Sequence, residues 1–208
     1  ITLVVNLATR TNALLYNTAI ASGPTGIVLA SYRKMHVYGS SPQFDAPSSG
    51  DLSFFRTSNG NTLGLLVCVD LEFMEPLNAL LKVVPDLTAL VIPASWSNTP
   101  PLSFSVLYPQ GLSRAIEAKT GRNVTVLFAN CGQNSACWGA GAYKSGFSIG
   151  KEASAAPSEG EYHGVIKVPL HSTSISFSDT NENLYKLSLK PSKKTELEAV
   201  VENIDCII

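Results

Sequence analysis

Residues 63–70 read Leu63-Gly64-Leu65-Leu66-Val67-Cys68-Val69-Asp70, and a second apolar run, Leu87-Thr88-Ala89-Leu90-Val91-Ile92, follows one helix-length segment later. Neither run alternates apolar and polar residues, which is typical of strands that are covered on both faces. Between them, residues 75–82 are expected to form a helix with a proline in its first turn. The pattern predicts a strand over 63–69, a crossover helix and a second buried strand.

The same alternation of elements continues along the chain. A second helix is expected within residues 102–119 and a further strand over 124–129, which completes a βαβαβ unit with its strand ends on one sheet edge. Residues 145–161 are rich in Gly, Ser, Ala and Pro and indicate a surface loop. The fold class is therefore mixed α and β. Additional strands are expected at 3–7, 26–32, 163–170, 172–177 and 184–189, and a helix at 193–202.

Composition narrows the classes of function. A chain of 208 residues that is 45% hydrophobic can bury one sizeable core. Its net charge of −1 is spread without long runs of one sign, which argues against nucleic acid or an anionic membrane as partner. No apolar run reaches the length of a spanning helix. The chain opens without Met on the strand-like run Ile1-Thr2-Leu3-Val4-Val5, as an internal piece of a longer protein would.

The cysteines and one glycosylation motif favour an extracellular location. Four cysteines and three histidines show no paired metal-ligand spacing, so no metal site is expected. Cys131 and Cys137 lie close together in a polar loop and are candidates for a local disulfide. Asn123-Val124-Thr125 is an acceptor motif for N-glycosylation in a polar context. We expect a secreted protein.

Two residues could carry chemistry, although each also has a structural interpretation. Cys68 lies near the end of a predicted strand, where open α/β sheets present ligand-binding groups. Free cysteines are, however, among the most buried residue types, so a structural role is the simpler interpretation of Cys68 taken alone. Lys34, in Tyr32-Arg33-Lys34-Met35-His36, would by itself be a solvated strand end.

Three groups of motifs, which follow one another along the chain, change this interpretation. Together they resemble the vanin and biotinidase branch of the carbon–nitrogen hydrolase, or nitrilase, superfamily over roughly residues 3–145. The first group surrounds Lys34, the second surrounds Cys68 and the third follows it. The motifs are Leu15-Tyr16-Asn17-Thr18-Ala19, Gly26-Ile27-Val28-Leu29-Ala30, Tyr32-Arg33-Lys34, Pro42-Gln43-Phe44-Asp45-Ala46-Pro47, residues 63–70 with Glu75-Pro76, Ile92-Pro93-Ala94-Ser95-Trp96-Ser97-Asn98, Phe128-Ala129-Asn130 and Gly139-Ala140-Gly141-Ala142-Tyr143.

The resemblance implies a fold and a domain organisation. Residues 1–170 would form a nitrilase-like four-layer α-β-β-α sandwich that is incomplete at its N-terminal part. Residues 171–208 would be a β-rich C-terminal extension belonging to an accessory domain. A second chain or an N-terminal segment would complete the fold.

The resemblance also implies a site. Cys68 would be the nucleophile that forms a thioester, Lys34 would stabilise the tetrahedral intermediate, and no cofactor is needed. An oxyanion also needs a backbone donor, and the N–H of Val69, directly after the nucleophile, is placed to supply it. The substrate pocket implied by the family motifs consists of Trp96, Asn98, Asn130 and Tyr143.

One departure from the family leaves two functions open. The family's base glutamate would lie upstream of residue 1, and the nearest acids are Glu72, Glu75 and Glu117, of which the first two are expected to face solvent or to cap the helix. The first hypothesis is a secreted amidohydrolase that cleaves a small pantetheine- or biotin-type amide. The second is a catalytically silent secreted carrier, storage or ligand-binding protein on the same fold. A cytosolic nitrilase-like amidase is disfavoured by the glycosylation motif.

Overall fold

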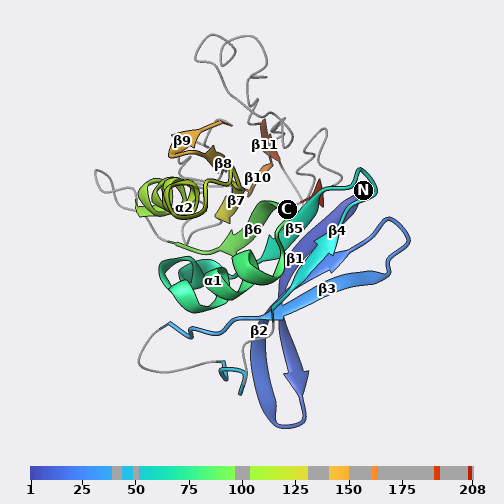
Figure 1. Ribbon diagram of the computed structural model, residues 1–208. Coiled ribbons are helices and arrows are strands. Elements are labelled where there is room, and N and C mark those ends of the chain that lie inside the picture. The colour runs from blue at the N-terminus through green and yellow to red at the C-terminus, as the bar shows by residue number, and fades with distance from the viewer. Residues whose placement is uncertain are drawn as a thin grey trace.

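The computed structural model describes residues 1–38, 44–48, 52–96, 104–130, 141–149, 161–163, 190–192 and 206–207. Strands and helices alternate through its middle part, as the buried apolar runs predicted (Figure 1). The elements are β1 (Thr2–Thr11), β2 (Leu14–Ser22), β3 (Val28–Arg33), β4 (Phe54–Arg56), β5 (Thr62–Leu65), the 3₁₀ helix η1 (Cys68–Glu72), α1 (Met74–Val83), β6 (Leu87–Ala94), α2 (Phe104–Thr120), β7 (Thr125–Asn130), β8 (Gly141–Lys144), β9 (Phe147–Ser148), β10 (Glu161–His163), β11 (Lys190–Ser192) and β12 (Cys206–Ile207).

Two sheets pack against each other beneath a layer of helices. The larger sheet has the strand order β4-β5-β6-β7-β8-β9, the smaller one has the order β12-β1-β2-β3, and β10 pairs with β11. Helices α1 and α2 lie on the larger sheet (Figure 1). One apolar core joins both sheets, since Val4, Ala19 and Tyr32 of the smaller sheet share it with Leu63 and Ile92 of the larger.

The central strands confirm the prediction made from residues 63–92. β5, β6 and β7 are parallel neighbours, with Leu65 opposite Val91 and Val91 opposite Leu127. All of these side chains are buried, as expected of strands covered on both faces. Gly64 lets helix α1 approach β5 closely, because a Cβ atom there would collide with Leu80 of α1.

Some element predictions were wrong. The strand expected over 63–69 ends at Leu65, and Cys68 begins a 3₁₀ helix instead of lying on the strand. Strand β2 forms at Leu14–Ser22, where the sequence indicated none, and β9 lies in the segment expected to be a loop. The helices expected at 75–82 and within 102–119 are confirmed as α1 and α2. The elements expected at 172–177, 184–189 and 193–202 lie outside the described residues.

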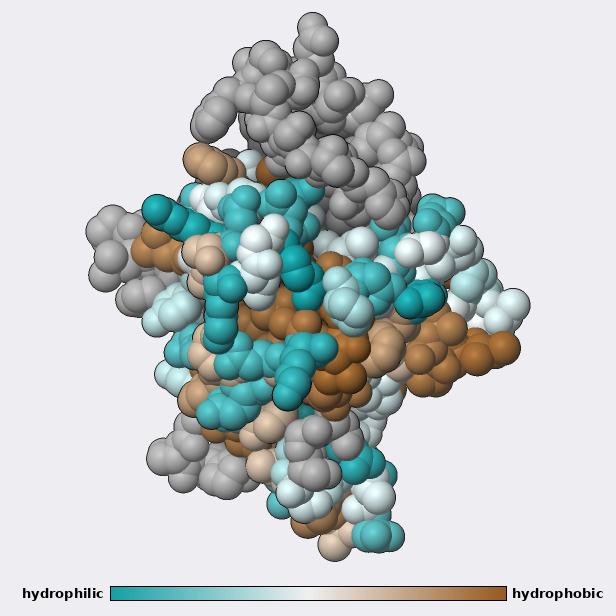
Figure 2. All heavy atoms as spheres, in the orientation of Figure 1, coloured by the Kyte–Doolittle hydropathy of each residue, from teal (hydrophilic) through white to brown (hydrophobic). Residues whose placement is uncertain are grey.

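Three layers of the nitrilase-like sandwich are present in the described residues. They are the helical layer and the two sheets, while the outer face of the smaller sheet is partly open to solvent. Leu3 and Leu7 on that face of β1 are 36% and 49% exposed. Ile27, in the connection between β2 and β3, and Val28, at the start of β3, are exposed as well, and Figure 2 shows that apolar residues contribute to the surface seen in this view. In the part of the chain that the structure describes, no helix is long and apolar enough to span a membrane.

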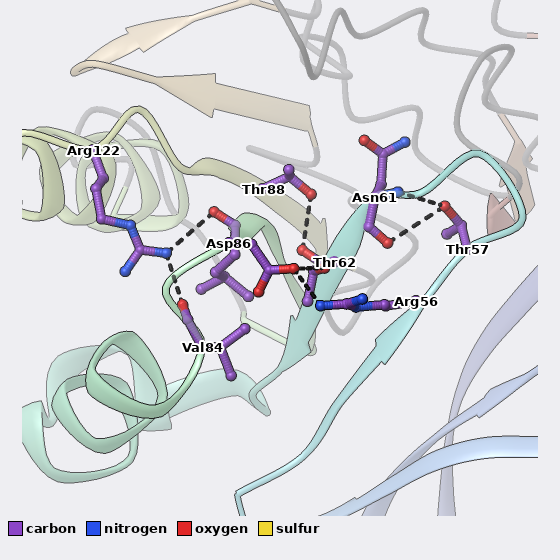
Figure 3. A network of polar contacts seen from close by, with 9 residues as sticks. Arg56, Thr57, Asn61, Thr62, Val84, Asp86, Thr88 and Arg122 are labelled. Carbon is purple, nitrogen blue, oxygen red and sulfur yellow. Dashed lines mark hydrogen bonds and ion pairs between the residues drawn. The ribbon is translucent and has the colours of Figure 1, made fainter.

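A polar network closes the amino ends of the parallel strands (Figure 3). The Arg122 guanidinium donates to the carbonyl oxygens of Leu81 at 2.9 Å and Val84 at 2.8 Å, where α1 turns into β6. Asp86, just before β6, accepts from Thr62 at 3.0 Å and from Arg56 at 2.6 Å. These contacts satisfy turn carbonyls and hold the starts of β5 and β6 together.

Candidate active site

Cys68 occupies a sharp turn between β5 and η1. Its φ is +54°, in the left-handed region that a residue with a Cβ atom rarely adopts. The turn is closed by the Asp70 N–H, which donates to the Val67 carbonyl at 3.1 Å. Cys68 is a free cysteine and is partly exposed just beyond the carboxyl end of β5. Backbone strain of this kind is concentrated at functional sites.

Asp70 is a fully buried carboxylate that joins this turn to the end of β3. Its oxygens accept hydrogen bonds from the Tyr32 hydroxyl at 2.9 Å, the His36 N–H at 2.9 Å and His36 Nδ1 at 2.8 Å. Burial and the neighbouring Asp70 carboxylate raise the pKa of the Tyr32 phenol, so Tyr32 remains a donor at physiological pH. The His36 ring also stacks on Phe73, with ring centroids 3.7 Å apart. These contacts fasten the segment after β3 onto η1.

Lys34 lies in the middle of the segment that Asp70 fastens. Tyr32 and His36, two residues before and two after it, both bond Asp70, and the Lys34 N–H donates to the Asn17 carbonyl at 2.8 Å. The Lys34 side chain is buried, with 7% of it exposed. The residue is therefore not the solvated strand end that its sequence context alone suggested. Contact between its ammonium group and Cys68 stays a prediction.

Trp96 and Asn130 meet at the carboxyl ends of β6 and β7. The Trp96 N–H donates to Asn130 Oδ1 at 2.7 Å, and Asn130 Nδ2 donates back to the Trp96 carbonyl at 3.2 Å. The indole Nε1 of Trp96 lies 2.8 Å from Cys68 Sγ and donates to it. The structure thus brings together three residues of the predicted site, Cys68, Trp96 and Asn130.

Some of the remaining predicted site residues lie within the described residues, and others lie outside them. Val69 is the second residue of η1 and is nearly buried, while Tyr143 is fully buried in β8. Asn123 is exposed just before β7, and its Oδ1 accepts from Ser145 Oγ at 2.6 Å. Their functional roles stay predictions. Asn98, Cys131 and Cys137 lie outside the described residues.

The acidic residues that could serve as the general base are Glu72, Glu75 and Glu117, together with the buried Asp70. Glu72 is exposed, and the Glu75 side chain is 73% exposed with its Oε2 3.9 Å from His36 Nε2. Burial lowers the pKa of Lys144, and the charge of the Glu117 carboxylate acts in the opposite direction. Asp70 already accepts three hydrogen bonds. In the described ranges, no hydrogen bond joins any of these four carboxylates to the Cys68 sulfur.

The sequence analysis missed the group formed by Tyr32, His36 and Asp70. A signal was available, because an aspartate two residues after a candidate nucleophile in an apolar run must be buried and must find partners. The partners themselves could not be identified, since they lie 38 and 34 residues away in the chain.

Comparisons with known proteins agree with this geometry. The carbon-nitrogen hydrolase family model matches residues 1–83. Biotinidase of Takifugu rubripes is 30% identical over 115 residues, and Vanin-like protein 2 of Drosophila melanogaster is 33% identical over 119 residues. Each match covers 55% of this chain but only 21% and 22% of the relatives, so the chain spans about a fifth of their length.

A solved structure extends the likeness of the fold. The amidase from Nesterenkonia sp. superposes with a TM-score of 0.57 and 24% identity, over 72% of this chain and 56% of the amidase chain. A mutant of that amidase, with a TM-score of 0.58 and 23% identity, carries acrylamide added at its active-site cysteine. The motifs, the fold and the relatives agree: residues 1–83 match the carbon–nitrogen hydrolase family, and over 55% of its length the chain is similar to biotinidase and vanin-like proteins.

Proposed function

We propose that the protein hydrolyses a small amide of the pantetheine or biotin-amide type through a thioester on Cys68. The observation that carries this proposal is the strained turn at Cys68, whose sulfur accepts a hydrogen bond from Trp96 Nε1 at 2.8 Å. A purely structural cysteine needs neither a left-handed backbone nor a dedicated donor. The names of the relatives, biotinidase and pantetheinase, indicate the substrate class.

The proposed reaction has two halves. The Cys68 thiolate attacks the amide carbonyl carbon, and the tetrahedral oxyanion is stabilised by the Lys34 ammonium group and the Val69 N–H. The carbon–nitrogen bond then breaks, the amine leaves with a proton and a thioester remains on Cys68. Water attacks the thioester carbonyl, the carbon–sulfur bond breaks, and the acid and the free thiol are released.

Both halves require a general base that moves protons. Asp70 is occupied by Tyr32 and His36, and Glu72 and Glu75 are exposed. We therefore propose that a carboxylate from a part of the protein beyond these 208 residues, or from a second chain, completes the site. The small share of the relatives that this chain spans is consistent with such a contribution.

The test measures amine release from pantetheine and from biotinyl-lysine with the intact protein. The expected result is turnover that Cys68→Ala abolishes and that Glu72→Gln, an exposed carboxylate in η1, leaves unchanged. Mass spectrometry of a quenched reaction should find the acyl group on the peptide that contains Cys68. Absence of both turnover and acyl adduct would support a silent ligand-binding protein instead.

Secretion and N-glycosylation belong to the same proposal. Asn123 is exposed and begins an acceptor motif, which supports a glycan at this residue. The natural protein should be found outside the cell and should lose mass on enzymatic removal of N-glycans, whereas Asn123→Gln protein should not. Peptide mapping with and without reduction tests the expected Cys131–Cys137 bridge. An unchanged mass of the natural protein after deglycosylation would reject the glycan.

A further inference from the structure

The indole of Trp96 points its only polar hydrogen at the candidate nucleophile. A tryptophan side chain is a donor and has no acceptor, so in the 2.8 Å contact the Cys68 sulfur must accept. A sulfur carrying negative charge accepts a hydrogen bond more strongly than a neutral thiol does, because charge-assisted hydrogen bonds are the stronger class. The contact is therefore strongest at the moments of a reaction when the sulfur bears negative charge.

The surroundings fix the position of this donor. Trp96 lies just beyond β6, and Asn130 ends β7, where it pairs with Ala94. The buried Asn130 amide binds both the N–H and the carbonyl of Trp96, as a neighbouring strand would. The edges of Phe128 and Tyr108 also contact the indole, each with ring centroids 5.5 Å apart. The donor is thus held in place by several independent contacts before any substrate is bound.

We propose that Trp96 is a catalytic residue, whose indole N–H stabilises the Cys68 sulfur whenever that sulfur bears negative charge. The inference rests on the proposed thioester chemistry and deepens it. In the first half, the N–H holds the attacking thiolate. When the thioester is hydrolysed, the carbon–sulfur bond breaks and its electron pair returns to sulfur, where the same N–H receives it. Asn130 is a positioning residue that acts through Trp96.

The most direct test removes the N–H and leaves the shape of the ring. Trp96 is replaced, at its single codon in the intact protein, by 3-benzothienylalanine, in which a sulfur atom takes the place of the indole nitrogen. The same protein with ordinary tryptophan at position 96 is the matched control. Alkylation of Cys68 by iodoacetamide at neutral pH is followed by mass spectrometry. The expected result is an alkylation rate about tenfold lower in the analogue, because the reacting sulfur has lost a charge-assisted hydrogen bond.

Two substitutions add independent readouts. Trp96→Phe should slow alkylation as the analogue does and should accumulate acyl-enzyme during turnover, because the departing thiolate is no longer stabilised. Trp96→His restores a ring donor and should recover part of the rate. Circular dichroism checks that the variants fold, and the isosteric analogue preserves the test if Trp96→Phe does not fold.

The outcomes separate this inference from the proposed function. Equal alkylation rates in the analogue and its control would overturn the role of Trp96, whatever the turnover. If alkylation falls as expected while the intact protein hydrolyses no amide, the donor assignment to the sulfur stands and the amidase proposal fails. If turnover occurs but Trp96→Phe shows no accumulated acyl-enzyme, the role in thioester breakdown is rejected.

Discussion

At the amino ends of β5, β6 and β7 polar side chains close backbone turns, whereas at the carboxyl ends of the same strands polar side chains converge on a sulfur atom. Arg122 at the amino end donates to carbonyl oxygens of the turn that follows α1. At the carboxyl end, Trp96 donates to Cys68, whose backbone is strained. Both ends are polar, yet among the described residues it is the carboxyl end that holds a cysteine on a left-handed backbone.

This difference suggests a criterion: the hydrogen-bond partner of a polar side chain indicates whether the side chain serves stability or chemistry. Where the partners are backbone carbonyls that would otherwise be unsatisfied, the contact stabilises the fold. Where a donor is directed at a nucleophile, its contribution lies in the reaction. Substitutions at the amino end should therefore change unfolding and leave thiol reactivity unchanged, while most substitutions at the carboxyl end should do the reverse.

The largest expected effect is the loss of reaction in Cys68→Ala. Amide hydrolysis by the intact protein should fall at least ~10⁴-fold, because removing a covalent nucleophile removes the thioester path altogether. Thermal unfolding followed by circular dichroism should show that the fold is retained. Residual turnover within tenfold of the wild-type rate would place the chemistry elsewhere.

Lys34→Ala should produce the next largest effect. Loss of the proposed oxyanion stabiliser should lower kcat by about 10²–10³-fold. If the ammonium group lies beside Cys68 as proposed, its loss should also slow Cys68 alkylation. Lys82→Ala, which removes a lysine from the last turn of α1, is the matched control and should react as wild type does. Steady-state kinetics and alkylation rates are the measurements. An unchanged kcat would show that Lys34 is buried for packing alone.

Asp70→Asn tests whether the division between the two ends has an exception. Asp70 lies at the carboxyl end but binds Tyr32 and His36, so its loss should reduce both stability and alkylation. Replacing a buried carboxylate that accepts three hydrogen bonds should lower the free energy of unfolding by about 2–4 kcal/mol. Tyr32→Phe removes one of those contacts and should cost about 1–2 kcal/mol. Urea unfolding measures both, and alkylation unaffected by Asp70→Asn would restrict the residue to a structural role.

Arg122→Ala should affect only stability. Its half-buried guanidinium satisfies two turn carbonyls at short distance, and losing these contacts should lower the free energy of unfolding by about 1–3 kcal/mol. Arg122→Lys keeps the charge but cannot span both carbonyls and should recover only part of the loss. Cys68 alkylation should stay at the wild-type rate. A slower alkylation in the folded variant would contradict the separation of the two ends.

The smallest effect is expected at Asp86, which is at the surface. The Thr62 hydrogen bond, together with contacts including Arg56, lowers the pKa of this carboxyl below its ordinary value. The unfolded chain therefore binds this proton more readily than the folded one, so the contribution is present at neutral pH and is lost as pH falls through the lowered pKa. Asp86→Asn should narrow the difference between urea midpoints at pH 7 and in acid by a small amount. A widened difference would reverse the sign of this linkage.

The helices and strands that were predicted correctly are those whose apolar residues follow a clear pattern along the sequence. β6, α1 and α2 were predicted because burial on both faces of a strand, or on one face of a helix, leaves a pattern in the sequence. β2 was missed because Ala19 and Ala21 are buried only by the packing of the two sheets, which no local pattern reveals. The apolar residues 66–69 were assigned to a strand for a related reason, since an apolar run does not reveal that the chain leaves the sheet at the turn around Cys68.

The candidate site was predicted in part, through residues carried by family motifs. Cys68, Trp96 and Asn130 were named from sequence, and the structure places them in contact through Trp96. Which atoms bond could not be predicted, because the contacts join the ends of different strands. The Tyr32–Asp70–His36 group was missed because its members are ordinary core and loop residues until the fold brings them together.

The left-handed backbone at Cys68 also has a consequence for the stability of the protein. Glycine or asparagine would adopt a φ of +54° at lower cost than cysteine, so folding alone favours replacing this residue. A lineage released from any need for the thiol could accept Cys68→Gly and gain stability in doing so. If the proposed activity is correct, keeping the thiol therefore costs stability, and the balance between stability and activity depends on a single torsion angle.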